Sequence, residues 1–276
     1  MKRPGREYES CSPAKRPLLY DLAYNVFDIP AECDQLFALA GQHGLTRVRR
    51  MLDLGCGTGQ YAAYLASLGI SVTAIDTDRY MLSHARHVAR QGNHGVVGIN
   101  FVKGDMRERI ASQRVDLCIC LGASFNSLIN DGDAARTLDA VGAALTTPGV
   151  FLLELHDPRA TYGKDLTARW TVNTAAARVR GQFSMVPMRT GVYRWDIAVR
   201  AEFVDGGRSR MLMRTKARPW KRRDIERICG ATGSMRLAGW HRVVEAGAAP
   251  RIIAAFTRAH DPVTTGRDAK QVRDRR

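Results

Sequence analysis

The sequence lacks any run of about 18 apolar residues, so no segment is expected to cross a membrane as a helix. The first residues, MKRPGREYESCSPAKRP, lack the apolar centre of a secretory signal peptide. The six cysteines form no Cys-x-x-Cys pair and no His-x-Cys ligand cluster. Cys118 and Cys120 share one face of an expected strand, but two ligands alone do not hold zinc. We therefore expect reduced thiols, no metal site and a cytoplasmic protein.

Positive charge is abundant. The chain has 42 Lys and Arg against 27 Asp and Glu, a formal net charge of +15. Such an excess is compatible with nucleic acid, an acidic partner or a membrane surface. The arginines are spread along the whole chain, with mild concentrations in 1–16, 208–223 and 258–276. This scatter favours a solvated basic surface and leaves a nucleic-acid footprint as the alternative.

The chain of 276 residues, 45% hydrophobic, is long enough for one large α/β domain with an insertion. Residues 18–45 predict two helices separated at Pro30. From Arg50 onwards, short β-like runs alternate with helical windows that keep one apolar stripe, such as Met81, Ala85 and Val88. This alternation predicts a parallel sheet with helices on both faces.

Beyond Pro158 the periodicity changes. In VYRWDIAVRAEF, apolar residues alternate with charged ones, and SRMLMRTKAR repeats the alternation after the turn VDGGR. The two runs predict an antiparallel hairpin with an apolar face and a basic face, and the weaker run RWTVNTAAARVRGQF predicts a third strand. A helix follows Pro219 and ends at a glycine, and two further strands follow in 235–245 and 250–258.

The expected fold class is therefore α/β, a Rossmann-like, doubly wound, seven-stranded, mostly parallel sheet with an antiparallel insertion between the fifth strand and the last helix. The expected boundaries are a basic disordered leader over 1–17, N-terminal helices and a cofactor-binding core over 18–164, the antiparallel insertion over 165–218, a C-terminal helix and two core strands over 219–260, and a disordered tail over 261–276.

The segment MLDLGCGTGQ places Gly55, Gly57 and Gly59 between a strand and a helix. A glycine turn here lets a ligand touch the backbone beside the free N–H groups of the helix N-terminus. A dinucleotide motif needs a third glycine where Gln60 stands, and no G-K-[ST] phosphate loop follows. Asp53 would repel a pyrophosphate and attract an ammonium group.

Two further strands end in acidic residues. Asp76 closes the second strand and can accept both hydroxyls of a ribose. The third strand ends in GDM, where Asp105 can accept an adenine amino hydrogen and Met106 can cover the ring. The ligand predicted from these residues has an adenosine, no pyrophosphate and an amino-acid end.

From about Tyr20 to Arg258, the chain resembles the class I S-adenosylmethionine-dependent methyltransferases. The resemblance is carried by LDLGCGTG, AIDTDRYML, GDM, VDLCICLGASFNSL and LTTPGVFLLEL, in the family's order. TTPGV departs from the usual P-G-G in a surface turn. The resemblance implies S-adenosylmethionine as cofactor and a cofactor site of Tyr20, Tyr24, Asp53, Gly55, Gly57, Gly59, Asp76, Thr77, Met81, Asp105, Met106, Leu121 and Gly122. Within it, Met81 would pack on the adenine, Leu121 and Gly122 would line the sulfonium, and the tyrosines would close over the methionine carboxylate.

The acceptor is less constrained. Candidate catalytic residues are Asn126, His156 and Tyr193, and Asp157, Arg194 and His241 are also near expected strand ends or in the insertion, with His241 read as structural. LGASFNSL is similar to small-molecule N-methyltransferases of the glycine and amino-sugar kind, although these often carry a histidine where Ser127 stands. We expect the apolar face of the insertion, including Tyr193, Trp195, Met211 and Met213, to form a lid or homodimer surface; simple packing on the sheet is the alternative.

Three functional hypotheses follow. The first is a methyltransferase that acts on nitrogen or oxygen of a small molecule by direct displacement. The second is an RNA or other nucleic-acid methyltransferase, which the absence of N-P-P-Y and P-C motifs disfavours. The third is a catalytically inactive partner that binds the cofactor.

Overall fold

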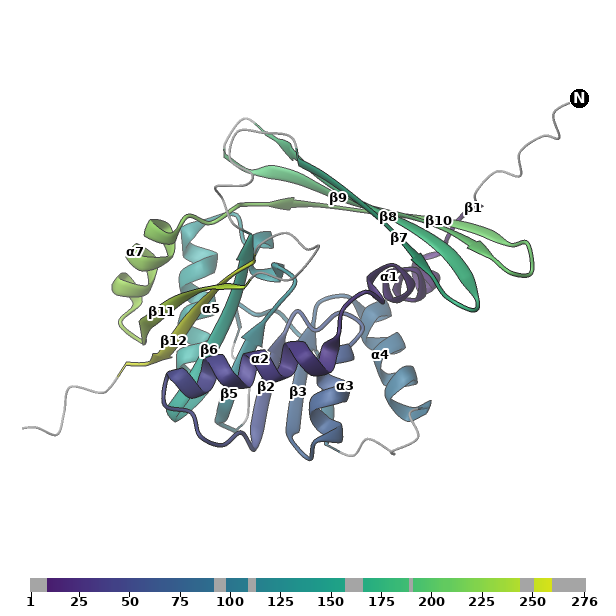
Figure 1. Ribbon diagram of the computed structural model, residues 1–276. Coiled ribbons are helices and arrows are strands. Elements are labelled where there is room, and N and C mark those ends of the chain that lie inside the picture. Colours follow the sequence, from purple (N-terminus) through teal and green to yellow (C-terminus); the bar gives the residue numbers. More distant parts are fainter. Residues whose placement is uncertain are drawn as a thin grey trace, which may run out of the picture.

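The computed structural model describes residues 9–91, 98–108, 113–156, 166–188, 191–243 and 251–259. These residues form two sheets with helices packed on and between them (Figure 1). None of the helices in these ranges is long and apolar enough to cross a membrane.

The larger sheet has seven strands in the order β11-β12-β6-β5-β2-β3-β4. Its strands are β2 (Arg50–Leu54), β3 (Ser71–Asp76), β4 (Ile99–Lys103), β5 (Val115–Cys120), β6 (Leu145–His156), β11 (Met235–Val243) and β12 (Arg251–Arg258). The strands β2 to β6 are mutually parallel, and β12 joins β6 in antiparallel orientation. The predicted Rossmann-like sheet is confirmed.

Helices cover both faces of this sheet. They are α2 (Ile29–Gln42), α3 (Gln60–Ser67), α4 (Arg79–Gln91), α5 (Asp131–Ala144) and α7 (Arg222–Thr232). One core cluster joins α2 and α3 to the sheet, and another joins α5 and α7 to it. Because both faces are covered, β5 is almost entirely buried, and its sequence VDLCIC is a continuous apolar run except for Asp116.

Local sequence sets the helix ends. Asp28 caps α2 by accepting a hydrogen bond from the N–H of Ala31 at 3.1 Å, and Pro30 occupies the first turn, where its missing N–H costs nothing. Gly233 ends α7 in the left-handed region, with φ of 68°. The predicted division at Pro30 and the predicted glycine stop are both confirmed.

The smaller sheet has five strands in the order β1-β10-β9-β8-β7. They are β1 (Glu9–Ser10), β7 (Leu166–Asn173), β8 (Ala177–Pro187), β9 (Tyr193–Phe203) and β10 (Arg208–Ala217). The hairpin β9–β10 is as predicted. The run predicted as one further strand is instead a second hairpin, β7–β8, whose turn is closed by the hydroxyl of Thr174 accepting from the N–H of Ala177 at 3.0 Å. No glycine marks this turn, and Asn173 and Thr174 are the turn-forming residue types in it.

The predicted disordered leader is wrong for residues 9–17. β1 pairs in parallel with β10, a 3-10 turn follows at Pro13–Lys15, and α1 (Arg16–Tyr24) begins before the expected boundary. A two-residue strand has no periodicity to detect; it forms because β10 offers it an edge. Residues 1–8 and the expected tail over 261–276 lie outside the described residues.

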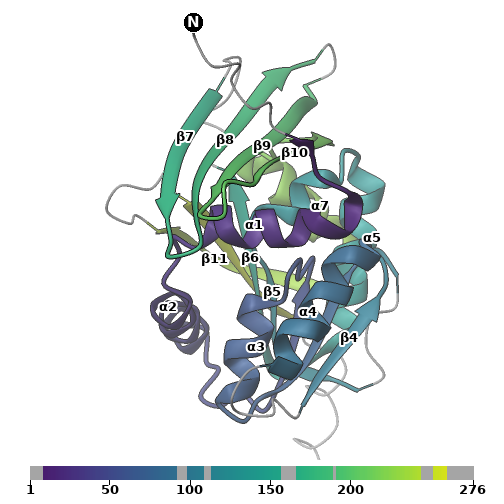
Figure 2. The same ribbon diagram turned by 90° about the vertical axis from the view of Figure 1, so that its right-hand side faces the viewer.

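α1 lies between the smaller sheet and the helices of the larger sheet (Figure 2). Leu19 and Ala23 are buried against Val179, Val199 and Met211 of the smaller sheet. The indole N–H of Trp170 donates to the carbonyl of Ala23 at 2.7 Å. These contacts fix α1 beneath the smaller sheet.

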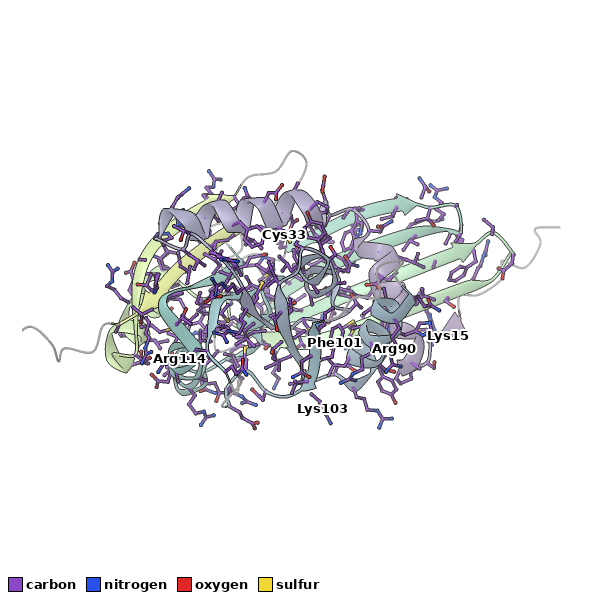
Figure 3. All side chains as sticks on the ribbon, turned by 90° about the horizontal axis from the view of Figure 1, so that it is seen from below. Lys15, Cys33, Arg90, Phe101, Lys103 and Arg114 are labelled. Atoms are coloured by element: carbon purple, nitrogen blue, oxygen red, sulfur yellow. The ribbon has the colours of Figure 1, made fainter. Side chains whose placement is uncertain are left out.

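The cysteines are free thiols. Cys33, labelled in Figure 3, belongs to α2 and is fully buried in the core between α2 and the larger sheet, and burial raises the pKa of its thiol to about 12. Cys118 and Cys120 are also fully buried in β5. These three thiols are therefore protonated packing groups at neutral pH.

Candidate cofactor and active site

The loop between β2 and α3 turns on three glycines with positive φ, at 71°, 54° and 75° for Gly55, Gly57 and Gly59. A Cβ on Gly55 would lie 2.8 Å from the side chain of Ser124, and one on Gly59 would lie 2.8 Å from the ring of Phe101. A Cβ on Gly57 would meet nothing within 4 Å. The first and third glycines are thus required by close packing, whereas the second borders open space that a ligand can enter.

Asp53 stands in β2 just before this loop. Its side chain is only 3% exposed, and its Oδ2 has no hydrogen-bond partner among the described residues. Burial, with the charge of Asp76 as a smaller cause, raises the pKa of Asp53 to about 7. A buried carboxylate with an unsatisfied oxygen is the counterpart of a cation that carries hydrogen-bond donors, such as an ammonium group.

Asp76 ends β3, and its carboxylate is already engaged. Oδ2 accepts from the N–H of Gly57 and Oδ1 from the N–H of Asp78, both at 2.8 Å. Burial is the main cause that raises its pKa above the usual value. Each carboxylate oxygen retains a lone pair for a ribose hydroxyl. Thr77 follows on the surface. The ribose assignment stays a prediction, and the structure adds that Asp76 holds the glycine loop.

The expected adenine side contains one contact the sequence analysis did not anticipate. Arg107 donates to both carboxylate oxygens of Asp105, with Nε 2.9 Å from Oδ1 and Nη2 2.5 Å from Oδ2. This guanidinium holds the pKa of Asp105 below its usual range. Met106 borders Gly55, and Met81 is buried at the start of α4. The adenine roles of Asp105, Met81 and Met106 remain predictions.

Tyr20 of α1 lies close to this region. Burial is the main cause that raises its pKa, followed by the charges of Tyr24, Asp21, Asp76 and Glu154, so its phenol lies near the ends of β3 and β6. The ring of Tyr24 lies 4.4 Å from that of Tyr20 but 5.4 Å from that of Trp170 in β7. Tyr20 therefore faces the strand ends, and Tyr24 backs it against the smaller sheet.

Asp21 fastens α1 over the glycine loop. Its Oδ1 accepts from Nε2 of Gln60 at 2.9 Å, and its Oδ2 lies 2.6 Å from Nε2 of His84 on α4. Gln60 directly follows the third glycine of the loop. One carboxylate thus joins α1 to α3 and α4, directly beside Tyr20.

The predicted sulfonium side is backed by a buried charge network. Leu121 is buried, and the N–H of Gly122 donates to Oε2 of Glu154 at 3.3 Å. Arg251 contacts both Glu154 and Glu32, at 3.4 and 3.2 Å. Tyr61 donates to Glu32. The network links β6, β12, α2 and α3 to the loop after β5, and desolvation raises the pKa of Glu154.

His156, the last residue of β6, meets the inner face of the smaller sheet. Its ring stacks on that of Phe183 at 5.4 Å and meets the ring of Trp195 edge-on at 4.7 Å. Burial lowers the pKa of His156 to about 4. Tyr193 and Trp195 belong to one buried cluster with Ala123, next to Gly122. The structure thus brings His156 and Tyr193 into one aromatic cluster, which includes Ala123, the residue after Gly122.

Other candidates are placed differently. Asn126 is fully buried and its amide donates to the carbonyl of Arg218 at 2.7 Å, which ties the loop after β5 to the end of β10; its Oδ1 has no partner among the described residues. Arg194 pairs with Asp196 at 3.2 Å. His241 contacts His43 at 2.8 Å, in keeping with the structural reading. Asp157 lies outside the described residues.

The glycine loop and the acids at the ends of β2 and β3 are compatible with a nucleotide ligand that donates a methyl group. Residues 51–149, which run from β2 into β6, match the family model described as "Methyltransferase domain". This part of the chain is therefore a methyltransferase domain. The unpartnered oxygen of Asp53 and the open space before Gly57 fit the cofactor of this family, S-adenosylmethionine.

Known proteins share parts of this methyltransferase domain. The glycine/sarcosine N-methyltransferase of Halorhodospira halochloris is 35% identical over 107 residues, 38% of this chain and 39% of that protein. The dTDP-3-amino-3,6-dideoxy-alpha-D-glucopyranose N,N-dimethyltransferase of Streptomyces fradiae is 28% identical over 138 residues, 49% of this chain and 51% of that protein. The matched region thus spans about half or less of these curated relatives.

The fold extends further than the sequence match. The crystal structure of Streptomyces venezuelae DesVI superposes with a TM-score of 0.73 over 89% of this chain and 98% of that chain, at 16% identity. At this identity the likeness shows the fold alone.

Asp21, Glu154 and Arg107 were not predicted from the sequence. Glu154 in LLELH is an acid at the end of an apolar strand, the same signal that singled out Asp53 and Asp76, and could have been found. Arg107 lies two residues after Asp105, so its pairing was also a local possibility, whereas Asp21 had no comparable signal because its partners Gln60 and His84 come from other helices.

Proposed function

We propose that the protein transfers a methyl group from S-adenosylmethionine to an amine nitrogen of a small molecule. The observation that carries the proposal is the buried Asp53, whose unpartnered oxygen requires a cation with hydrogen-bond donors at the carboxyl end of β2. The cofactor, when bound, supplies an electrophilic methyl group on a sulfonium, so that an N–CH3 bond forms as the S–CH3 bond breaks and the amine proton leaves to solvent.

The chain's own residues would supply position and dehydration. Asp53 would hold the amino group of the cofactor, and Asp76 its ribose. Tyr20, on a helix fastened by Asp21, would exclude water from the reacting groups. Positioning and exclusion of water are sufficient for an amine, because a neutral amine needs no strong base.

The acceptor would bind beside the aromatic cluster of His156, Phe183 and Trp195. Because burial lowers the pKa of His156 to about 4, its imidazole is neutral at pH 7 and does not repel a neighbouring sulfonium. The same low polarity would lower the pKa of an entering amine, which favours the neutral, nucleophilic form. The small-molecule relatives named above, which methylate nitrogen, support this choice over oxygen.

The test has two stages. Calorimetric titration with S-adenosylhomocysteine should give binding that Asp76→Ala weakens strongly. Methyl-tritiated S-adenosylmethionine should then label glycine, sarcosine or a dTDP-3-amino sugar, and not their hydroxyl analogues. Labelling of the hydroxyl analogues alone would contradict nitrogen transfer, and equal affinity of the Asp76 variant would contradict the cofactor site.

A further inference from the structure

The two faces of the smaller sheet differ in chemistry. The inward residues Val179, Val199 and Met211 are buried against α1. The outward positions alternate with them, and on β7, β8, β9 and β10 every outward ionisable residue except Asp196 and Glu202 is arginine or lysine. α1 and the larger sheet lie on the inward side (Figures 1 and 2). We call the outward side the basic face.

Three arginines of the basic face stand directly opposite one another. Arg180 on β8 pairs with Arg200 on β9, and Arg200 pairs with Arg210 on β10. All three are exposed. Neighbouring strands lie about 4.8 Å apart, and like charges directly opposite are destabilising. Arg180 also pairs with Glu202, and Arg210 donates to the hydroxyl of Ser10, but the register brings three guanidinium-bearing side chains into one row, the arginine ladder, that an anion can contact together.

The acids of the face do not neutralise it. Glu202 pairs with Arg180 at 3.1 Å, and Asp196 is shared between Arg194 and Arg214, at 3.2 and 2.8 Å. These pairs are exposed on their arginine side, where each contributes little to stability. The face therefore keeps a strong positive excess.

A groove runs beside the ladder. It is lined by Arg169, Trp170, Thr171, Arg180, Gly181, Gln182, Ala198 and Arg200, of which Trp170 and Gly181 are inward positions that pack on each other. Guanidinium, hydroxyl and amide donors together suit phosphate oxygens, which arginine can bind in bidentate fashion.

The residue types at the outward positions indicate which kind of partner fits the basic face. No outward position of β7 to β10 is aromatic, and the indole of Trp170, which borders the groove, is held on the inward side by its hydrogen bond to Ala23, so these strands offer no outward platform for the stacked bases of a single strand. Its large apolar side chains are only Leu212 and Val186 in these strands, too few for an anchored protein interface or for insertion into a membrane. The face is therefore suited to contact the phosphate backbone of a nucleic acid whose bases are paired.

We propose that the basic face binds the phosphate backbone of double-stranded nucleic acid, independently of base sequence. The face lies on the side of the smaller sheet away from α1 and the cofactor residues, so the duplex docks there and is not the methyl acceptor. The proposal is separate from the proposed function and stands on the ladder, the groove and the missing aromatics.

The experiment measures the fluorescence anisotropy of a labelled 24-base-pair duplex, as DNA and as RNA, against the full chain from 50 to 300 mM NaCl. The logarithm of affinity should fall linearly with the logarithm of salt. R180Q/R200Q/R210Q should weaken binding at least tenfold at 100 mM NaCl and reduce the slope by about 2.7, since each lost phosphate contact removes about 0.9. R180K/R200K/R210K should retain most of the slope.

The matched control removes equal charge elsewhere. R47Q/R90Q/R223Q changes three exposed arginines outside the smaller sheet, of which Arg90 is labelled on α4 in Figure 3. It should leave the slope nearly unchanged. A loss as large as that of the ladder variant would overturn the proposal in favour of diffuse charge, as would binding to phosphatidylserine vesicles with no binding to either duplex.

Folding is checked independently. Because like charges are removed, the ladder variant should melt no lower than the parent and should bind S-adenosylhomocysteine equally well. If the triple variant does not fold, R210Q alone should reduce the slope by about 0.9; an unchanged slope in that variant would overturn the proposal.

Discussion

Asp53, which is buried, and Asp76, which is half-buried, are carboxylates on the neighbouring parallel strands β2 and β3, and the charge of Asp76 adds to the burial that raises the pKa of Asp53 to about 7. Asp76 is stabilised by two backbone N–H groups, whereas the unpartnered oxygen of Asp53 is unfavourable for folding. A ligand that brings positive charge to Asp53 would offset this cost.

Replacing Asp53 should separate stability from binding. Asp53→Asn removes a buried charge whose folded-state pKa is raised, so at pH 8 the free protein should gain stability, on the order of 2–4 kcal/mol. Affinity for S-adenosylhomocysteine should fall at least tenfold. Thermal unfolding and calorimetry at pH 8 measure both. A variant that melts lower and binds as well as the parent would contradict the assignment.

The same residue predicts a pH dependence. Because the folded protein holds the proton of Asp53 more tightly than the unfolded chain does, its contribution to stability falls as pH rises from about 4 to about 7. Binding of S-adenosylhomocysteine needs the ionised carboxylate and should strengthen as pH rises through about 7. Titrations from pH 5.5 to 8.5 test this, with Asp53→Asn expected to flatten the dependence.

The attachment of α1 should control cofactor release. Asp21→Ala removes the contacts to Gln60 and His84, so α1 should close less firmly over the glycine loop. We expect S-adenosylhomocysteine to dissociate about tenfold faster, measured by stopped flow. Asp34→Ala is the control, because Asp34 is an exposed acid on α2; an equal effect there would rule out a specific role for Asp21.

Substitutions in the aromatic cluster of His156 and Trp195 should affect turnover more than cofactor affinity. Trp195→Leu and His156→Gln should each lower kcat/KM for an amine acceptor about tenfold or more while leaving S-adenosylhomocysteine affinity within twofold. Since burial lowers the pKa of His156 to about 4, the rate should show no histidine ionisation between pH 6 and 8 in the parent. A group titrating near 6.5 that disappears in His156→Gln would contradict a neutral imidazole.

Prediction from the sequence succeeded where information was local. The parallel strands are short apolar runs ended by acids or glycines, and the cap at Asp28 and the stop at Gly233 act within a few residues. The turn at Thr174 and the strand β1 were missed because each depends on a partner strand. The contacts of Asp21 were missed for the same reason: they join α1 to α3 and α4, which sequence periodicity cannot align.

The sequence by itself determined the order of strands and helices, the glycine loop with its acid, and the alternation that gives the insertion an apolar and a basic face. Only the tertiary structure decided that α1 lies beneath that insertion, that His156 meets Phe183 and Trp195, and that three arginines stand in register. Local backbone preferences and periodic burial are written along the chain, whereas register and packing between distant elements are settled by the mutual fit of their side chains.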